Sequence, residues 1–197
     1  MVQLALEKGE KVVATLRKPS DLDDLVLKYP SNQLVVLRLD VTDPSEIARA
    51  FRQAKAAFGR VDVVFNNAGR WMLGEVEGTP EDESRKLFDI NFWGAANVNK
   101  EAVRFFREEN PAGAGGRLLV TSSDGGIATF LLNGFYTASK FGQHIHIFLR
   151  IIAENFPALE GITQTLHQEL DPDWNIKVSS STAKNLWVLT PAKRLHW

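Results

Sequence analysis

Tyr136-Thr-Ala-Ser-Lys140 is the stretch of this 197-residue chain that decides its fold and its chemistry. Tyr136 and Lys140 are four residues apart, and in a helix this spacing puts both side chains on one face. An ammonium group beside a phenol favours the ionised phenol, which then exchanges protons more readily at cellular pH. The spacing therefore predicts an acid–base pair near the start of a helix.

Length and composition narrow the class of protein. The chain has a net charge of −1 and 44% hydrophobic residues, so one domain with a real core is expected, with no affinity for nucleic acid or for an anionic membrane. No apolar run reaches the roughly 20 residues of a membrane span. The absence of cysteine predicts a cytoplasmic protein without disulfides. His144 and His146 alone do not make a metal site, and no metal is expected.

Short apolar runs alternate with amphipathic helical segments along the chain. Strands are predicted at Lys11–Leu16, Leu34–Leu39, Val61–Phe65, Arg117–Thr121 and Ile176–Ser179. Helices are predicted at 2–8, 19–29, from Pro44 after a cap at Thr42 or Asp43, at 80–108, and from Tyr136. Continuous apolar strands separated by helices predict a doubly wound parallel sheet, an α/β fold of the Rossmann-like type.

Such a sheet binds ligands at the carboxyl ends of its strands. Asp40, Asn67, Gly69 and Ser123 all fall at or just after predicted strand ends. Each of these residues alone also suits an ordinary turn. Their combination at one edge of the sheet favours a site.

The order of the motifs from Arg17 to about Asp173 resembles the short-chain dehydrogenase/reductase family, of the classical type. The resemblance rests on Asp40-Val41, Asn66-Asn67-Ala68-Gly69, Asn91, Ser123 and the Tyr136–Lys140 stretch. It implies an oxidoreductase that interconverts an alcohol and a carbonyl compound by hydride transfer with a nicotinamide cofactor.

The resemblance also implies a role for each matching residue. Tyr136 would be the acid–base, and Lys140 would assist it and bind the nicotinamide ribose. Ser123 would orient the substrate oxygen, and Asn91 would hold a water that links Lys140 to solvent. The alternatives are packing for Tyr136, turn chemistry for Ser123 and a helix kink at Asn91.

The same resemblance implies that Asp40 and Val41 meet the adenine, while Asn67, Ala68 and Gly69 line the adenosine side. The choice of cofactor rests on Leu16-Arg17-Lys18, where a carboxylate would favour NAD(H). An arginine there suits a 2′-phosphate, so we expect NADP(H) in preference to NAD(H). The alternative is that Arg17 belongs to an ordinary basic turn.

Three departures from the family pattern stand out. The first is that no T-G-x-x-x-G-x-G loop precedes Val2, so the chain is expected to be truncated, without the first strand and the loop that would receive the pyrophosphate. Because that strand is expected near the centre of the sheet, its absence should leave a gap or force its neighbours to pair.

The second departure is residues 142–157, which interrupt what would otherwise be one smooth helix. Joining Phe141 to Ala158 would align Leu159, Ile162 and Leu166 in one stripe, whereas the intervening residues rotate that stripe by roughly 160°. We interpret them as an insertion that did not evolve as a loop, such as a retained intron. A genuine lid or dimerisation helix is the alternative.

The third departure is the tail, residues 179–197, which lacks the Pro-Gly pair and the threonine that the family places there. Trp187 and Trp197 receive no predicted role, and Trp71, Met72 and Phe130 would line either an apolar pocket or the core. The rival functions are a non-catalytic fragment that binds no cofactor, and a scaffold that forms a homo-oligomer. Because of the three departures, weak or absent activity is expected for the chain itself.

Overall fold

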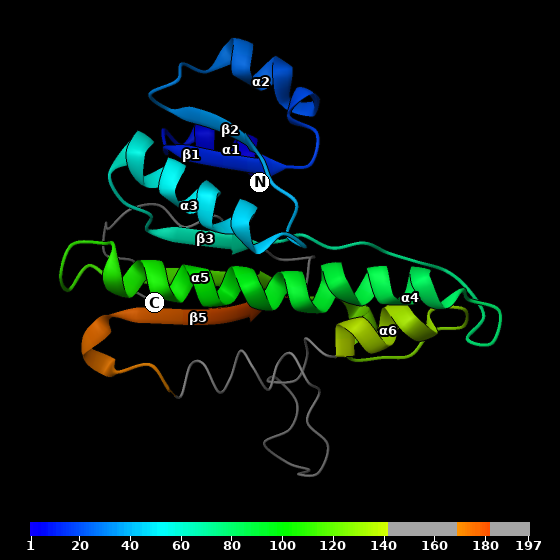
Figure 1. Cartoon of the computed structure of the whole chain (residues 1–197). Helices are drawn as coiled ribbons and strands as arrows, with labels where there is room; N and C mark the ends of the chain where they lie inside the picture. The colour runs from blue at the N-terminus through cyan, green and yellow to red at the C-terminus, as the bar shows by residue number, and fades with distance from the viewer. Residues whose placement is uncertain (142–168, 182–197) are drawn as a thin grey trace.

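The computed structural model describes residues 1–141 and 169–181 (Figure 1). Residues 142–157, interpreted above as an insertion, lie outside the described residues. The same holds for the tail beyond Ser181, including Trp187 and Trp197.

Helices and strands alternate as the sequence predicted. The strands are β1 (Val12–Leu16), β2 (Leu34–Arg38), β3 (Val63–Asn66), β4 (Gly116–Thr121) and β5 (Ile176–Ser181). The α-helices are α1 (Val2–Glu7), α2 (Asp23–Lys28), α3 (Pro44–Phe58), α4 (Glu81–Phe88), α5 (Ala95–Glu108) and α6 (Gly134–Phe141). The shorter helical segments are η1 (Pro19–Leu22), η2 (Asp89–Gly94), η3 (Asp124–Gly126) and η4 (Pro172–Trp174). The long helical region predicted at 80–108 is therefore α4 and α5 joined by η2, which is π-helical.

All strand pairs in the described residues are parallel. β1 pairs with β2, with Val12 opposite Leu34. β3 pairs with β4 and β4 with β5, with Val63 opposite Arg117 and Gly116 opposite Ile176. Parallel strands linked through helices are the doubly wound α/β arrangement that the sequence predicted.

The five strands form two separate sheets, β1-β2 and β3-β4-β5. In a parallel ladder, alternate residues direct their backbone groups to opposite edges. The Val12 N–H donates to Gln33 O, so the backbone groups of Val13 and Thr15 face the edge of β1 away from β2. The Arg117 N–H donates to Asp62 O, so Val63 and Phe65 face the edge of β3 away from β4. The sheet is thus interrupted between β1 and β3, one of the two outcomes expected for a missing central strand.

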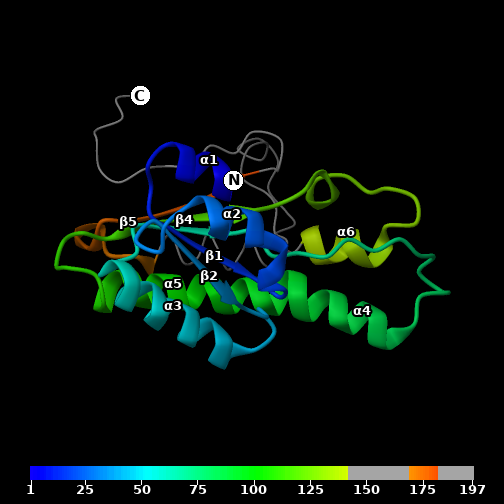
Figure 2. The ribbon, with the colours of Figure 1, turned by 90° about the horizontal axis from the view of Figure 1, so that it is seen from above.

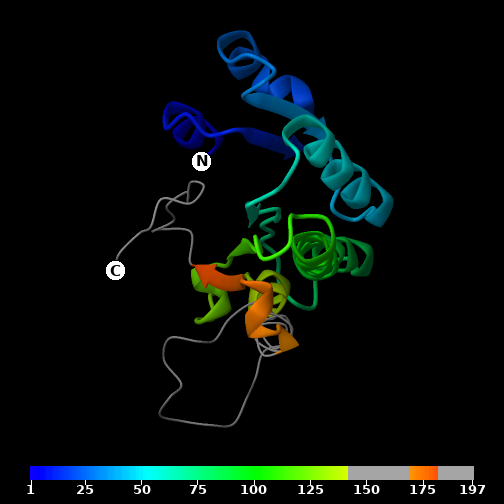
Figure 3. The same cartoon turned by 90° about the vertical axis from the view of Figure 1, so that its left-hand side faces the viewer.

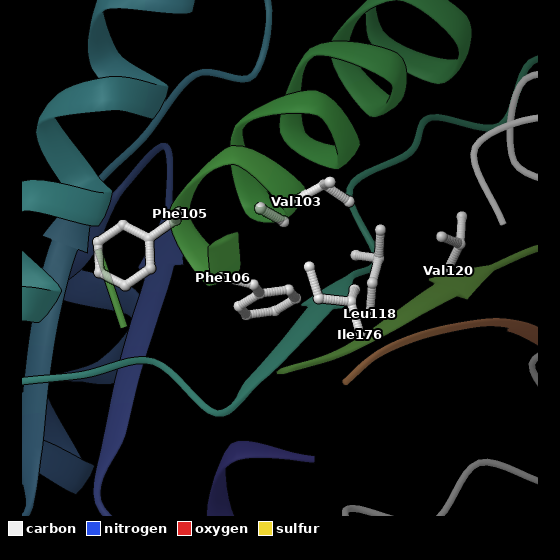
Figure 4. Close-up of a cluster of buried hydrophobic side chains, with 7 residues drawn as sticks. Val103, Phe105, Phe106, Leu118, Val120 and Ile176 are labelled. Carbon is white, nitrogen blue, oxygen red and sulfur yellow. The ribbon is translucent and has the colours of Figure 1, made fainter. Parts of the chain in front are cut away.

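The largest buried cluster lies between α5 and the second sheet. Phe106 of α5 packs with Leu118 of β4 and Ile176 of β5 (Figure 4). Phe105 contacts the Phe51 ring of α3 at 5.5 Å between centroids. Figure 3 shows α3 and α5 on the same side of the strands, with α1 on the opposite side. This packing fixes the carboxyl ends of β3 and β4, from which the candidate site residues extend.

The amino terminus of α3 follows the predicted capping chemistry. The Asp43 carboxylate accepts hydrogen bonds from the N–H groups of Ser45 and Glu46, and Pro44 occupies the first turn. Buried Ile47, Ala50 and Ala54 form the apolar face that the periodicity predicted. The cap and this face together hold the turn after β2, where Asp40 lies.

Candidate active site

Tyr136 and Ser123 come together at the carboxyl end of β4. The Tyr136 hydroxyl donates a hydrogen bond to Ser123 Oγ over 3.0 Å, although the two residues are thirteen positions apart. Tyr136 lies in the first turn of α6, and Ser123 follows β4 and caps η3. Both side chains are half-buried, so a pair of hydroxyl groups borders solvent at the ligand-binding edge of the sheet.

Gly125 makes room for this arrangement. The Ser123 hydroxyl also accepts a hydrogen bond from the Gly125 N–H at 3.1 Å, which fixes its orientation. A Cβ atom at Gly125 would lie only 3.0 Å from Cε1 of the Tyr136 ring. A larger residue at position 125 would therefore have to displace the tyrosine ring by a few tenths of an ångström.

Lys140 lies one turn after Tyr136 on α6, and only 6% of its surface is exposed. Burial lowers the pKa of Lys140 from 10.5 to about 8, because a charged ammonium loses hydration there. A Cβ atom built at Gly69 would lie 3.5 Å from Lys140 Nζ and 3.4 Å from Asn91 Oδ1. Lys140 and Asn91 thus both border the Gly69 backbone at the end of β3.

Asn91 is fully buried in the π-helical segment between α4 and α5. Its Oδ1 accepts from the Arg70 N–H at 2.8 Å, and its Nδ2 donates to Arg70 O at 2.9 Å. The same Nδ2 donates to Ser139 Oγ at 2.9 Å. The asparagine side chain therefore joins the loop after β3 to α6, and π-helical segments often occur at functional sites.

Ser139 is a residue that the sequence reasoning missed. It is fully buried, it accepts from Asn91, and its hydroxyl donates to the Tyr136 carbonyl oxygen at 2.7 Å. One continuous set of hydrogen bonds thus runs from Arg70 through Asn91 and Ser139 to the backbone of Tyr136. Its position beside Lys140 was the only available signal, and a single serine in a helix does not stand out.

Asp40 and Arg17 follow β2 and β1, at neighbouring strand ends. The Asp40 carboxylate accepts from the Thr42 N–H at 3.0 Å and from the Thr42 hydroxyl at 2.8 Å. These hydrogen bonds lower the pKa of Asp40, and the positive charges of Arg17 and Arg38 lower it further. Arg17 is exposed and lies close enough to Asp40 for their charges to interact.

The remaining predicted cofactor residues have different environments. Asn67, Ala68 and Gly69 are exposed after β3, as a ligand-binding turn requires. The Val41 side chain is instead buried against Ile47 and Val98, so a contact of Val41 with a ligand would have to use its backbone.

The comparison with protein families agrees with this geometry. The family model described as short chain dehydrogenase matches residues 1–155, most of the chain. The chain belongs to the short-chain dehydrogenase family.

Several short-chain dehydrogenase relatives match over most of the sequence. An uncharacterized oxidoreductase of Schizosaccharomyces pombe is 37% identical over 197 residues, which is 100% of this chain and 59% of the relative. The 3-ketodihydrosphingosine reductase of Bacteroides thetaiotaomicron is 31% identical over 89% of this chain and 55% of the relative.

The solved structure of a short-chain dehydrogenase from Streptomyces avermitilis has a TM-score of 0.73 and 34% identity. That alignment covers 91% of this chain and 58% of the solved one. The chain therefore spans less than two thirds of the length of these family members.

The described part of this short-chain dehydrogenase was also compared with the requirements of a metal site and of a membrane-spanning helix. Residues 1–141 and 169–181 contain no group of three or more His, Cys, Asp or Glu side chains that could hold a metal ion. Among the helices in those same ranges, none has both the length and the apolar character needed to cross a bilayer.

Proposed function

We propose that this chain carries the catalytic residues of an NADP(H)-dependent oxidoreductase that interconverts an alcohol and a carbonyl compound. The observation that carries the proposal is the 3.0 Å hydrogen bond between the Tyr136 hydroxyl and Ser123 Oγ. Lys140 supports it, because a buried lysine one turn away on the same helix has its pKa lowered to about 8. Perturbed titratable groups near a ligand-binding edge are typical of active sites.

Each side chain has a distinct role in this proposal. When bound, the nicotinamide cofactor supplies or accepts the hydride at the substrate carbon. In the direction of reduction, Tyr136 donates its hydroxyl proton to the substrate oxygen, and in oxidation it accepts that proton. Ser123 accepts from Tyr136 and Gly125, so its hydroxyl is oriented beside the tyrosine, where it can orient the substrate oxygen. Lys140 brings a buried amino group to the Gly69 backbone, where it can bind the nicotinamide ribose.

In this proposal Asn91 positions the segments around the site and does not act on the substrate. Its side-chain amide is engaged with the Arg70 backbone and with Ser139, so it fixes the loop after β3 relative to α6. The water relay from Lys140 that the family resemblance implies for Asn91 stays a prediction.

The strand ends carry groups that fit the two ends of NADP(H). Exposed Arg17 offers a guanidinium for a 2′-phosphate, and the nearby Asp40 carboxylate is a hydrogen-bond acceptor for the adenosine. Gly69 borders Lys140, which the proposal assigns to the nicotinamide end, since a Cβ atom at Gly69 would lie 3.5 Å from Lys140 Nζ. No turn in the sequence has the T-G-x-x-x-G-x-G spacing that would receive the pyrophosphate, so the fit covers the ends of the cofactor and not its middle.

The Bacteroides relative is named as a reductase of a keto compound, which supports carbonyl reduction as the type of reaction. The proposal is tested by unfolding the purified chain thermally with and without NADPH, and by following NADPH absorbance with a ketone. NADPH at a hundred times its Kd should raise the free energy of unfolding by about 2.7 kcal/mol. If millimolar NADPH neither protects the chain against unfolding nor is consumed with the ketone, the non-catalytic fragment is favoured instead.

A further inference from the structure

Two loops beside the candidate site expose an unusual amount of apolar surface. One loop follows Gly69 and Arg70 and contains residues 71–76. The other, residues 124–133, joins Ser123 to α6. Of the eleven large apolar residues that are exposed in residues 1–141 and 169–181, seven lie on these loops. This apolar loop surface consists of Trp71, Leu73, Val76, Ile127, Phe130, Leu131 and Leu132.

Hydrogen bonds hold the two loops together. The Gly74 N–H donates to Leu132 O at 2.8 Å, and Gly74 forms a parallel β-bridge with Asn133. The Trp71 indole N–H donates to Asn133 Oδ1 at 2.8 Å. The apolar loop surface is therefore a built feature of the fold, formed by two segments about sixty residues apart in sequence.

The two loops that carry the apolar loop surface connect directly to the segments that carry the hydroxyl pair. Residues 124–133 lie between Ser123 and Tyr136, whose hydroxyl groups are hydrogen-bonded to each other. The other loop follows Arg70, whose backbone N–H donates to Asn91. In Figure 2 both loops lie at the end of the molecule that carries α6. Both loops therefore share an end of the molecule with the candidate site residues.

The charge pattern narrows the ligand further. Residues 71–74 and 127–135 contain no charged side chain. The nearest charges along the two loops are Arg70, whose guanidinium pairs with Glu83 at 2.8 Å, and the acidic Glu75, Glu77 and Asp124. Because Arg70 is already paired with Glu83 and the other three bordering groups are acidic, the two loops offer little attraction to a carboxylate or a phosphate. Several exposed apolar side chains gathered on two adjoining loops are typical of a binding site.

We propose that the apolar loop surface binds the body of a neutral, hydrophobic ketone or secondary alcohol whose oxygen lies at Ser123 and Tyr136. This inference rests on the proposed function and adds the class of substrate to it. Burial of each extra methylene against Phe130 and Leu131 then raises the affinity of the substrate.

The test is a ligand-observed NMR titration of the purified chain with 2-butanone, 2-hexanone and 2-octanone, without cofactor. The affinity of the unaltered chain should rise about twofold to fourfold for each added methylene. The double variant F130S/L131S should lose most of this dependence on chain length. The variant L27S is the matched control, because Leu27 on α2 is 88% exposed and Leu131 is 89% exposed, and it should retain the dependence.

Two further measurements separate the possible failures. If affinity rises with chain length but no ketone is reduced by NADPH, the proposed function fails while the apolar ligand class stands. If 2-butanone and 2-octanone bind equally, or are reduced with equal kcat/KM, the substrate class is wrong even where reduction occurs. Light scattering measures whether the chain forms a dimer. A dimer that is lost in F130S/L131S and kept in L27S would assign this surface to a second copy of the chain and overturn the proposal.

Discussion

The Asn91 amide donates to Ser139 Oγ over 2.9 Å, and this hydrogen bond joins the π-helical segment η2 to the helix that carries Tyr136 and Lys140. Both side chains are fully buried. Because Asn91 also hydrogen-bonds both the N–H and the carbonyl oxygen of Arg70, its side chain connects the loop after β3 to α6. This pair therefore helps to position α6 relative to the strand ends.

Replacement of Ser139 by alanine should lower the free energy of unfolding by about 1–2 kcal/mol. The change removes one hydrogen bond to Asn91 and one to the Tyr136 carbonyl, both inside the protein. Ser122 provides the control, since its hydroxyl is buried without a hydrogen-bond partner in the described structure. Urea unfolding should show that S122A is neutral or stabilising, and equal losses in the two variants would contradict the assignment.

Replacement of Lys140 by methionine should change how stability depends on pH. Burial lowers the pKa of Lys140 to about 8 in the folded state, against 10.5 as its ordinary value. Between these two values the unfolded chain binds more protons than the folded chain, so the stability of the unaltered protein rises with pH. K140M lacks this contribution.

The stability of the unaltered protein relative to K140M should therefore increase by up to about 3 kcal/mol between pH 7 and pH 10.5. Denaturant unfolding at several pH values measures this difference. K100M, which removes an exposed lysine of α5, controls for the loss of a positive charge. A stability difference between K140M and the unaltered chain that stays constant with pH would show that Lys140 is not buried as described.

Gly94 in η2 should not tolerate alanine, because a Cβ atom there would lie 2.7 Å from Val41 Cγ2. G94A should cost about 1–3 kcal/mol of stability through overpacking. V41A removes the methyl group that the new side chain meets, so the double variant should be more stable than the sum of the two single losses. Strict additivity in a thermal or urea unfolding series would show that Val41 does not pack against this turn.

Replacement of Arg17 by alanine should weaken NADPH binding roughly tenfold or more and leave NADH binding unchanged, since only NADPH carries the 2′-phosphate. Lys18 is the neighbouring control, because its ammonium pairs with Asp21 at 3.3 Å. Fluorescence titrations with both cofactors compare R17A and K18A. Equal weakening for NADH, or a larger loss in K18A, would contradict the predicted preference for NADP(H).

Much of the fold could be predicted because apolar periodicity and capping residues are local signals. Asp43 and Pro44 marked the start of α3, and strand ends were placed within about two residues. The π-helical segment could not be predicted in the same way, since one widened turn leaves the apolar pattern of a long helix almost unchanged. The sequence did indicate Asn91 within it, but not that its amide binds Arg70 and Ser139.

The candidate site, like the fold, could be predicted only in part from the sequence. Tyr136 and Ser123 were predicted to act together, and the structure brings their hydroxyl groups into contact. Trp71 and Phe130 could not be assigned from hydrophobicity, which favours the core and a pocket equally. The structure exposes both on loops that are hydrogen-bonded to each other around Gly74 and Asn133, a long-range pairing that no local pattern indicates.

The most direct test of the account is the rate of ketone reduction by NADPH for the unaltered chain and for Y136F. If the Tyr136 hydroxyl donates the proton to the substrate oxygen, Y136F should lose at least about a hundredfold in kcat while binding NADPH as before. A Y136F protein that reduces the ketone at the rate of the unaltered chain would contradict the central claim.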